Sequence, residues 1–411
     1  MITVMILAGE SSGELYGSLL AKALKKKWPD VHIIGMGGSR MREAGVELIA
    51  HISDAFGLLE AVSSLSKIKT ALKNAREALR KFRPQVLIPI DYPDFNLKVA
   101  AMAKPLGVKI LYYVSPQVWA WRKGRIRKIA GLVDRMTVIL PFEEKIYKDA
   151  GLECEFVGHP VLEEIEEVLK SAVGGQQSTV SDKTSFGLSN ITINPELKAH
   201  FKNILGLNPQ QPLLSILPGS RPSELNRHFP LLVDMIQQFK RDPEIASAGH
   251  YQFCSPLAPN TDAERYKPYL EHLRREDVVI RKGESVRVLA ASDMAVVASG
   301  TATLQTALLE VPMVVMYKLS PLTYQLGKRI VKVKYISLVN ILSGEEVVRE
   351  LLQESANPVE IVKELKKITF DKRHRENMIT AFRMIKGQFA DKKPSERVAE
   401  IVMEMAGRSS H

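Results

Sequence analysis

The feature that most constrains the fold of this chain is a repeated pattern, in which a short apolar run leads into a glycine- and serine-rich turn and then into an amphipathic segment. Residues 2–8 lead into such a turn at 9–13, and residues 31–36 lead into another at 37–40. Apolar runs without alternation are typical of strands that are buried on both faces. Strands that alternate with helices indicate parallel βαβ units, so the pattern predicts an α/β fold.

The pattern occurs in both halves of the chain, which are separated by a stretch of different composition. Residues 171–199 contain little to bury, so we predict an interdomain linker with a partly disordered insertion. A chain of 411 residues is long enough for two domains at roughly 150 residues each. Further strands are predicted at Val86–Ile90, Lys109–Val114, Arg135–Leu140, Glu155–Val157, Leu213–Leu217, Tyr251–Ser255, Val278–Arg281, Met294–Ala298 and Met313–Tyr317.

The charge balance and the cysteine count narrow the function classes. Lys and Arg number 57 against 46 Asp and Glu, and this formal net charge of +11 suits an anionic partner such as nucleic acid, anionic lipid or a phosphorylated substrate. Cys154 and Cys254 lie far apart, which argues against a disulfide or zinc framework. No apolar run approaches the ~18 residues of a membrane span, and residues 1–8 lack the basic flank of a signal peptide.

The predicted strand Leu213–Leu217 ends in a turn suited to an anion. Gly219 lets the backbone approach a ligand closely, and Ser220 or Ser223 can cap the helix that follows. Free N–H groups at a helix N-terminus carry roughly +0.5 charge, and the guanidinium of Arg221 matches a phosphate bidentately. Gly219, Ser220 and Arg221 are therefore candidate phosphate-binding residues. The alternative is an ordinary turn with a surface arginine.

A second turn of this kind follows the predicted strand Met294–Ala298. Ser299, Gly300 and Thr301 can present N–H and hydroxyl donors to a diphosphate, unless they only cap the next helix. The turns at 9–13 and 37–40 do not spell G-x-G-x-x-G, so a nicotinamide dinucleotide site has little support.

Two carboxylates follow the predicted strand Val86–Ile90. Asp91 comes directly after the strand, where ligands bind in open α/β sheets, so it is the candidate general base. We expect Asp94 to cap the following helix. Trp119 and Trp121 follow another strand end and could stack on a sugar or line an acyl channel; the alternative is an aromatic corner of the core.

The segment from Asp54 to Phe82 is apolar at helical spacing and rich in lysine and arginine elsewhere. Its second half predicts a helix that packs on the sheet and presents a solvated basic face. Its first half has apolar residues on too many sides for one buried stripe, which suits an acyl chain or a membrane interface. The residues proposed for that contact are Phe56, Leu58, Leu59 and Val62.

Several of these motifs together resemble the lipid A disaccharide synthase family, in the family's order and over most of the chain except 165–200. The most specific is the string Val114-Ser115-Pro116-Gln117-Val118-Trp119-Ala120-Trp121-Arg122. The others are 9–13, 90–96, 217–221, 298–302 and 335–342.

The resemblance implies a GT-B fold, with two Rossmann-like domains facing a cleft and the last helices packing back on the first domain. The expected domains are 1–170 for the acceptor and lipid, 171–199 as linker, 200–358 for the UDP-sugar, and 359–411 as returning helices. The resemblance implies an inverting glycosyltransferase without metal or cofactor, which joins UDP-2,3-diacylglucosamine to 2,3-diacylglucosamine 1-phosphate (lipid X). It also implies a peripheral protein on the cytoplasmic face of the inner membrane, for which a homodimer is one allowed assembly.

The family also implies roles for particular residues. The residue matching Asp91 is a candidate base, and those matching Arg221 and Asn340 belong to the nucleotide site. GT-B enzymes usually carry Glu, which binds the ribose, where this chain has Gln305; the Gln carbonyl can still accept a hydrogen bond. The sequence contains no Asp-x-Asp to hold a divalent ion on the diphosphate.

Two other functions remain as alternatives. A UDP-N-acetylglucosamine 2-epimerase-like enzyme would have the same two-domain fold and would need no lipid surface. A nucleic-acid binder would use the positive charge, but the lysines are spread along helix faces and no aromatic nucleic-acid module is evident, so no nucleic-acid partner is expected.

Overall fold

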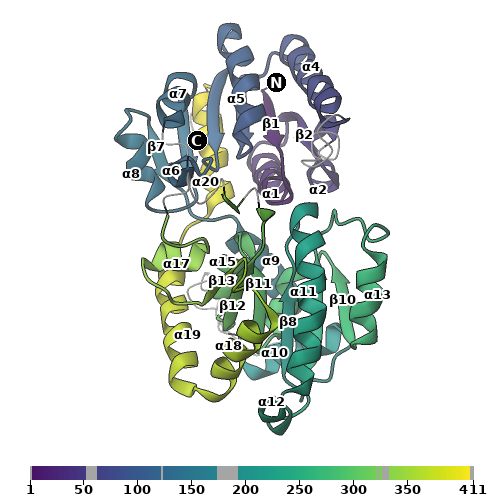
Figure 1. Cartoon of the computed structure of the whole chain (residues 1–411). Coiled ribbons are helices and arrows are strands. Elements are labelled where there is room, and N and C mark those ends of the chain that lie inside the picture. Colours follow the sequence, from purple (N-terminus) through teal and green to yellow (C-terminus); the bar gives the residue numbers. More distant parts are fainter. Residues whose placement is uncertain are drawn as a thin grey trace. The chain divides into compact units, whose positions relative to one another are not determined.

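The computed structural model describes residues 2–51, 63–121, 124–173, 193–321, 324–325 and 333–407. The chain divides into two compact units, one formed by Met1–Glu163 with Lys392–His411 and the other by Glu164–Asp391. Each unit is built on its own parallel sheet with helices packed against it (Figure 1). This is the predicted α/β architecture of two Rossmann-like domains.

The sheet of the first unit has seven parallel strands in the order β3-β2-β1-β4-β5-β6-β7. Their bounds are β1 Thr3–Ala8, β2 His32–Gly37, β3 Glu47–His51, β4 Val86–Ile90, β5 Lys109–Tyr113, β6 Arg135–Val138 and β7 Cys154–Phe156. The strand order reverses between β1 and β4, which pair from Val4 with Val86 to Ala8 with Ile90. Ligands of open α/β sheets bind at such a reversal, at the carboxyl ends of the strands. Asp91 follows β4 directly at that edge.

The helices of the first unit are α1 Ser11–Lys27, α2 Ser39–Glu43, α4 Ser63–Phe82, α5 Pro93–Ala103, α6 Val118–Trp121, α7 Arg125–Leu132, α8 Glu143–Lys148 and α20 Pro394–Met405, with a 3-10 turn at Lys104–Leu106. The C-terminal helix α20 packs on α1, although nearly 400 residues separate their starts (Figure 1). Arg397 Nε and Nη2 donate to the two carboxylate oxygens of Glu155, at 2.7 and 2.9 Å. This pair of bonds holds α20 to the edge strand β7.

The sheet of the second unit has six parallel strands in the order β10-β9-β8-β11-β12-β13. Their bounds are β8 Leu213–Leu217, β9 Gln252–Leu257, β10 Val278–Lys282, β11 Met294–Ala298, β12 Met313–Tyr317 and β13 Glu350–Leu352. Here the order reverses between β8 and β11, whose last paired residues are Leu217 and Val297. The turns that follow these two neighbours are the ones singled out in the sequence, at Gly219 and at Gly300.

The helices of the second unit include α9 Val161–Val173, which carries the chain from one unit into the other. The rest are α10 Pro195–Ile204, α11 Pro222–Arg241, α12 Pro243–Ser247, α13 Lys267–Arg275, α14 Ser285–Ala291, α15 Thr301–Leu308, α17 Leu338–Ser343, α18 Pro358–Phe370 and α19 Lys372–Gly387. Helix α18 packs on α11, and α19 packs on α15.

The domain boundaries differ from the predicted ones in three places. The first unit ends at Glu163 rather than at residue 170. Within the predicted linker, α10 already begins at Pro195, because Asn194 caps it by accepting from the Leu197 N–H at 2.8 Å. Of the predicted returning segment 359–411, only Lys392 onward belongs to the first unit. Helices α18 and α19 belong to the second unit instead, where α18 packs on β12 and β11 and α19 packs on the helices α15, α17 and α18.

The predictions of a lipid contact and of a missing membrane span depend on which residues the structure describes. Phe56, Leu58, Leu59 and Val62, the proposed lipid contact, lie outside the described residues. Within the described parts of the chain, no helix combines the length and the apolar character needed to cross a membrane.

Candidate active site

Asp91 sits in a backbone turn that the first unit holds tightly. Asp91 and Tyr92 have φ angles of 47° and 42°, in the left-handed region that is costly for residues other than glycine. The N–H of Asp91 donates to the Val114 carbonyl at 3.2 Å. Its carbonyl accepts from Tyr112 Oη at 2.6 Å and from Asn96 Nδ2 at 2.7 Å. Strain of this kind persists when the surroundings enforce it, and it is concentrated at functional sites.

Asp94 has a different place from the one predicted. The N-cap of α5 is Tyr92, and Pro93 is the first helical residue, so Asp94 lies within the first turn and does not cap the helix. Its carboxylate forms an ion pair with Arg125 Nη2 of α7 at 2.5 Å. Of the two carboxylates, Asp91 is the one that the turn after β4 positions at the sheet edge.

The turn after β1 packs directly against the Asp91 turn. A Cβ atom on Gly9 would lie 2.6 Å from Cβ of Tyr92, so only glycine allows the two strand ends to approach in this way. Glu14 of α1 is buried and accepts from the N–H of Arg40 at 3.0 Å, at the start of α2. At the turn 37–40, which resembles the Gly219-Ser220-Arg221 turn in sequence, a backbone N–H group is therefore already bound by a carboxylate of the chain itself.

Trp119 lies near this edge, and a residue that the sequence did not single out fixes it. The Trp119 Nε1–H donates to Glu143 Oε1 at 2.9 Å, and its ring meets Phe142 edge-on at 4.9 Å between centroids. The Trp121 side chain is outside the described residues. Glu143 follows no recognisable motif, and it lies 24 residues from Trp119, so no local signal could have identified it.

In the second unit, a carboxylate occupies the turn at Gly219-Ser220-Arg221. Glu224 Oε2 accepts from the N–H groups of Ser220 and Arg221, at 3.0 and 3.2 Å, while Oε1 accepts from Tyr317 Oη at 3.0 Å. The N-cap of α11 is Arg221, so the predicted capping by Ser220 or Ser223 is wrong. These two N–H groups are not available to a phosphate while Glu224 accepts from them.

The Arg221 side chain is partly exposed to solvent. It is 53% exposed, and Nη1 is 3.5 Å from Glu224 Oε1. Gly219 has a φ of 104°, and a Cβ atom there would lie 2.4 Å from Glu224 Oε2, so glycine is needed for the carboxylate to enter the turn. The guanidinium, rather than the backbone, is the part of this turn that can face an anion.

His228 connects the same turn to the residue that follows β12. Nδ1 lies 2.7 Å from the Pro218 carbonyl, and Nε2 accepts from the Lys318 N–H at 3.0 Å. This pair of partners requires a neutral ring with its proton on Nδ1. Burial lowers the pKa of His228, which favours that neutral form.

The turn at Ser299-Gly300-Thr301 is open at Gly300 and Thr301. Ser299 donates its N–H to the Met316 carbonyl at 3.3 Å and its hydroxyl to the Ile336 carbonyl at 2.9 Å, so the chain itself uses both of the donors predicted for a diphosphate. Helix α15 starts at Thr301 with Gly300 as N-cap, and no side chain caps it. The N–H groups of Gly300, Thr301 and Ala302 have no acceptor among the residues that the structure describes. A Cβ atom on Gly300 would meet nothing within 4 Å, so the turn faces open space. An uncapped helix N-terminus of this kind attracts an anion.

Asn340 and Gln305 both use their side chains within the second unit. Asn340 is fully buried; Nδ2 donates to Val348 O at 2.9 Å and Glu350 Oε1 at 2.8 Å, and Oδ1 accepts from the N–H groups of Val347 and Val348. These four bonds use its whole capacity. The Asn340 side chain therefore positions the chain before β13, and its part in the nucleotide site stays a prediction. Gln305 Nε2 donates to Glu164 Oε2 of α9 at 3.0 Å.

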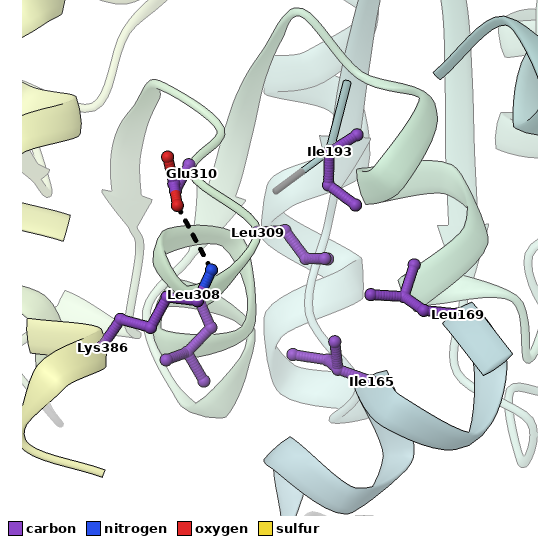
Figure 2. A pocket seen from close by; sticks show the side chains of 7 residues that line it. All are labelled: Ile165, Leu169, Ile193, Leu308, Leu309, Glu310 and Lys386. Carbon is purple, nitrogen blue, oxygen red and sulfur yellow. Dashed lines mark hydrogen bonds and ion pairs between the residues drawn. The ribbon is translucent and has the colours of Figure 1, made fainter. Parts of the chain in front are cut away.

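Figure 2 shows a small cavity in the second unit, between α9, the end of α15 and α19. Its apolar lining is Ile165, Leu169, Ile193, Leu308 and Leu309, and the Glu310–Lys386 ion pair closes one side at 3.2 Å. The cavity measures about 10 Å³, which is about the space of one water molecule. It contains none of the predicted site residues and is too small for a sugar nucleotide.

Comparison with known proteins agrees with the motifs. The family model described as lipid-A-disaccharide synthetase matches residues 4–186 and 188–402. The chain belongs to the lipid-A-disaccharide synthase family. Lipid-A-disaccharide synthase of Myxococcus xanthus is 37% identical over 404 residues, covering 98% of this chain and 97% of the relative. That of Geobacter metallireducens is 39% identical over 409 residues, with the same two coverages. The chain is thus a glycosyltransferase of this family.

Solved structures confirm the GT-B fold of the chain. UDP-GlcNAc 2-epimerase of Neisseria meningitidis, bound to UDP-GlcNAc, matches 99% of the chain and 100% of its own with a TM-score of 0.64 at 9% identity. The epimerase of Methanocaldococcus jannaschii, in complex with UDP-GlcNAc and UDP, has a TM-score of 0.60 at 15% identity and covers 98% of the chain and 100% of its own. At these identities the likeness shows the fold alone, so the epimerase alternative is a match of fold and not of family.

Proposed function

We propose that this protein transfers the diacylglucosamine of UDP-2,3-diacylglucosamine to the 6-hydroxyl of 2,3-diacylglucosamine 1-phosphate. The products are the β-1,6-linked disaccharide 1-phosphate and UDP, formed with inversion and without a metal. The observation that carries the proposal is that the candidate base belongs to one unit and the candidate diphosphate site to the other. Asp91, whose backbone N–H and carbonyl are hydrogen-bonded, follows β4 in the first, and an open helix N-terminus follows β11 in the second.

The second unit holds the nucleotide in this proposal. The N–H groups of Gly300, Thr301 and Ala302 donate to the diphosphate, and the Arg221 guanidinium neutralises part of its charge. Charge grows on the UDP oxygen as the bond to the sugar breaks. A well-placed donor commonly contributes ~3–4 kcal/mol to such a transition state. Because the sequence contains no Asp-x-Asp, these groups take the part that a metal ion has in other glycosyltransferases.

The first unit supplies the base in this proposal. The Asp91 carboxylate accepts the proton of the 6-hydroxyl as that oxygen attacks the anomeric carbon from the face opposite UDP, which inverts the centre. General base catalysis of this kind is worth roughly 10²–10⁴ in rate. The three hydrogen bonds on the Asp91 backbone fix the point of the chain from which the carboxylate extends before the acceptor arrives.

The basic face of α4 supports a position on an anionic membrane surface, at the cytoplasmic face of the inner membrane. Its apolar residues, including Ala71, Ala75, Ala78 and Leu79, are buried against the core. Its exposed residues include Lys67, Lys69, Lys73, Arg76 and Arg80. Each exposed basic residue near an anionic leaflet adds about 1 kcal/mol to the attraction.

The test is mass spectrometry of the products that purified protein makes from both lipid substrates in excess EDTA. We expect the disaccharide 1-phosphate and UDP in equal amounts. The Asp91→Asn variant should lose roughly 10²-fold or more in turnover with unchanged UDP affinity, and Asp94→Asn is its matched control. Turnover of UDP-N-acetylglucosamine alone would instead indicate the epimerase, and activity that only magnesium restores would contradict the metal-free mechanism.

A further inference from the structure

Glu143 is a buried carboxylate beside the Asp91 turn that has no part in the chemistry above. It is the first residue of α8, and it is 1% exposed. Its Oε1 accepts from Ser115 Oγ at 2.7 Å and from Trp119 Nε1 at 2.9 Å. Its Oε2 accepts from the Leu140 N–H at 3.2 Å. One carboxylate thus joins the segment after β5 to the turn before α8.

The segment that Glu143 holds starts in strained backbone. Val114 has a φ of 64°, which is rare for a β-branched residue. Its N–H donates to the Thr137 carbonyl at 3.1 Å, and its carbonyl accepts the N–H of Asp91 at 3.2 Å. Val114 therefore connects the Glu143-held segment directly to the turn that carries the base. Left-handed residues at two neighbouring strand ends indicate that the chain builds this edge at a cost in stability.

The ionised form of Glu143 is destabilised by its surroundings. The titratable groups that act on it electrostatically are Asp91 after β4, Tyr147 on α8 itself and Cys154 on β7, and none of the three is a cation. Burial, with a smaller contribution from Asp91, raises the pKa of Glu143 to about 7. A neutral glutamine could accept the bonds from Ser115 and Trp119 without this cost. A carboxylate in such surroundings is more typical of a functional site than of packing.

We propose that Glu143 is a positioning residue for the acceptor: its carboxylate orients Ser115 and Trp119 so that the indole ring is held beside Asp91. The inference depends on the proposed function, because acceptor binding at the Asp91 edge is part of that proposal. Trp119 is only half-buried, so part of its ring is exposed and can contact the sugar or its acyl chains while its N–H is fixed by Glu143.

A spectroscopic test needs no substrate. The Trp119 emission is obtained as the difference between wild type and Trp119→Phe, measured from pH 5.5 to 8.5. In wild type we expect a transition with a midpoint near pH 7, because protonation of Glu143 weakens its bond to the indole. The transition should vanish in Glu143→Gln and persist in Glu144→Gln, a neighbour on the same helix that pairs with Lys148 at the surface. Emission that does not depend on Glu143 would overturn the positioning role.

A kinetic test separates positioning from simple loss of structure. At pH 8, Glu143→Gln should raise KM for 2,3-diacylglucosamine 1-phosphate roughly tenfold, because the bonds from Ser115 and Trp119 then go to a neutral and weaker acceptor and the amide NH2 cannot accept from the Leu140 N–H. Its kcat and its KM for the donor should stay within about twofold of wild type. Wild-type KM for the acceptor should rise as the pH falls below about 7, whereas that of Glu143→Gln should be flat. A proportional loss of kcat for both substrates would instead show a structural role.

A second variant covers the case in which Glu143→Gln does not fold. Trp119→Phe keeps the carboxylate with Ser115 and Leu140 and removes one donor, and it should reproduce the rise in acceptor KM. Normal acceptor KM in Trp119→Phe would overturn the inference. Absence of disaccharide from the wild-type protein would overturn the proposed function and the acceptor role together, while the emission test would still decide whether Glu143 and Trp119 are coupled.

Discussion

Two turns of the second unit share a sequence pattern but differ in whether their backbone N–H groups have acceptors. Both follow neighbouring central strands, β8 and β11, and both place a glycine and a serine before a helix. The turn before α11 is filled by the carboxylate of Glu224, whereas the N–H groups of Gly300, Thr301 and Ala302 at the start of α15 have no acceptor among the described residues. The difference comes from the third helical residue, which is Glu224 in α11 and Thr303 in α15.

The comparison teaches that a strand, a glycine turn and a helix do not by themselves make an anion site. Glu at the third position reaches back to the N-cap and satisfies the donors from within. Thr303 instead donates its hydroxyl to the Gly300 carbonyl at 2.8 Å and leaves the amides open. On this account the α15 turn binds the diphosphate through its backbone, and the α11 turn contributes only the Arg221 side chain.

The largest expected effect comes from giving the α15 turn a carboxylate of its own. Ala302 is half-buried in the first turn of α15. Ala302→Glu should weaken UDP binding roughly 100-fold, because its carboxylate competes for the amides and repels the diphosphate. Ala302→Gln has the same size without the charge and should cost only a few-fold. Calorimetry of UDP binding measures both, and equal affinities for the two variants would break the comparison.

The next effect tests the side chain of the filled turn. Arg221→Lys keeps the charge but loses the planar fork, so UDP affinity should fall roughly tenfold, while Tm stays within about 1 °C because the side chain is 53% exposed. Arg241→Lys at the other end of α11 is the control and should leave both unchanged. UDP affinity that is unaltered in Arg221→Lys would remove this residue from the site.

Removing the internal carboxylate should have a smaller effect on binding and a larger one on stability. Glu224→Gln loses a buried charge that accepts from two backbone N–H groups, so the free energy of unfolding should fall by about 1–3 kcal/mol. UDP affinity should rise no more than about threefold, since a nearby negative charge is lost while the α15 amides are unchanged. A rise of 100-fold would mean that the α11 turn is the main phosphate site.

The smallest effect concerns pH. The folded-state pKa of His228 is lowered by burial, so its stabilising contribution is present above its unfolded value near 6.5 and declines as the pH falls below that value. Protonation would also break the bond in which Nε2 accepts from Lys318. His228→Gln should therefore lose less stability than wild type when urea unfolding at pH 7.5 is compared with pH 5. An identical loss in both proteins would show that the pKa of His228 in the folded state is not lowered.

The fold was largely predictable from sequence because most strands are continuous apolar runs. The predicted strands occur at the stated positions within one to two residues. The structure adds β3 and β13, two edge strands that carry Glu47 and Glu350 and lack that signal. The family resemblance was likewise sufficient for the GT-B fold and the enzyme class, because the Val114–Arg122 string is specific.

The state of the candidate site could not be predicted, because it depends on partners far apart in sequence. Glu224 is fixed partly by Tyr317, 93 residues away, and Glu143 meets Ser115 across 28 residues. Asn340 looked like a ligand contact because its motif matches the family, but its amide is used by the chain at 347–350. Residue type and position gave candidates, and only the three-dimensional contacts show which donors are still open.

The most direct measurement of the central claim follows individual backbone amides as UDP binds. In protein labelled with ¹⁵N at glycine, serine and threonine, UDP should shift the amide resonances of Gly300 and Thr301 strongly. The amide of Ser220 should keep its position within a fraction of that change, because Glu224 still accepts from it. A large shift of Ser220 with unmoved Gly300 and Thr301 would contradict the account, since it would mean that the diphosphate displaces Glu224 and binds at the α11 turn.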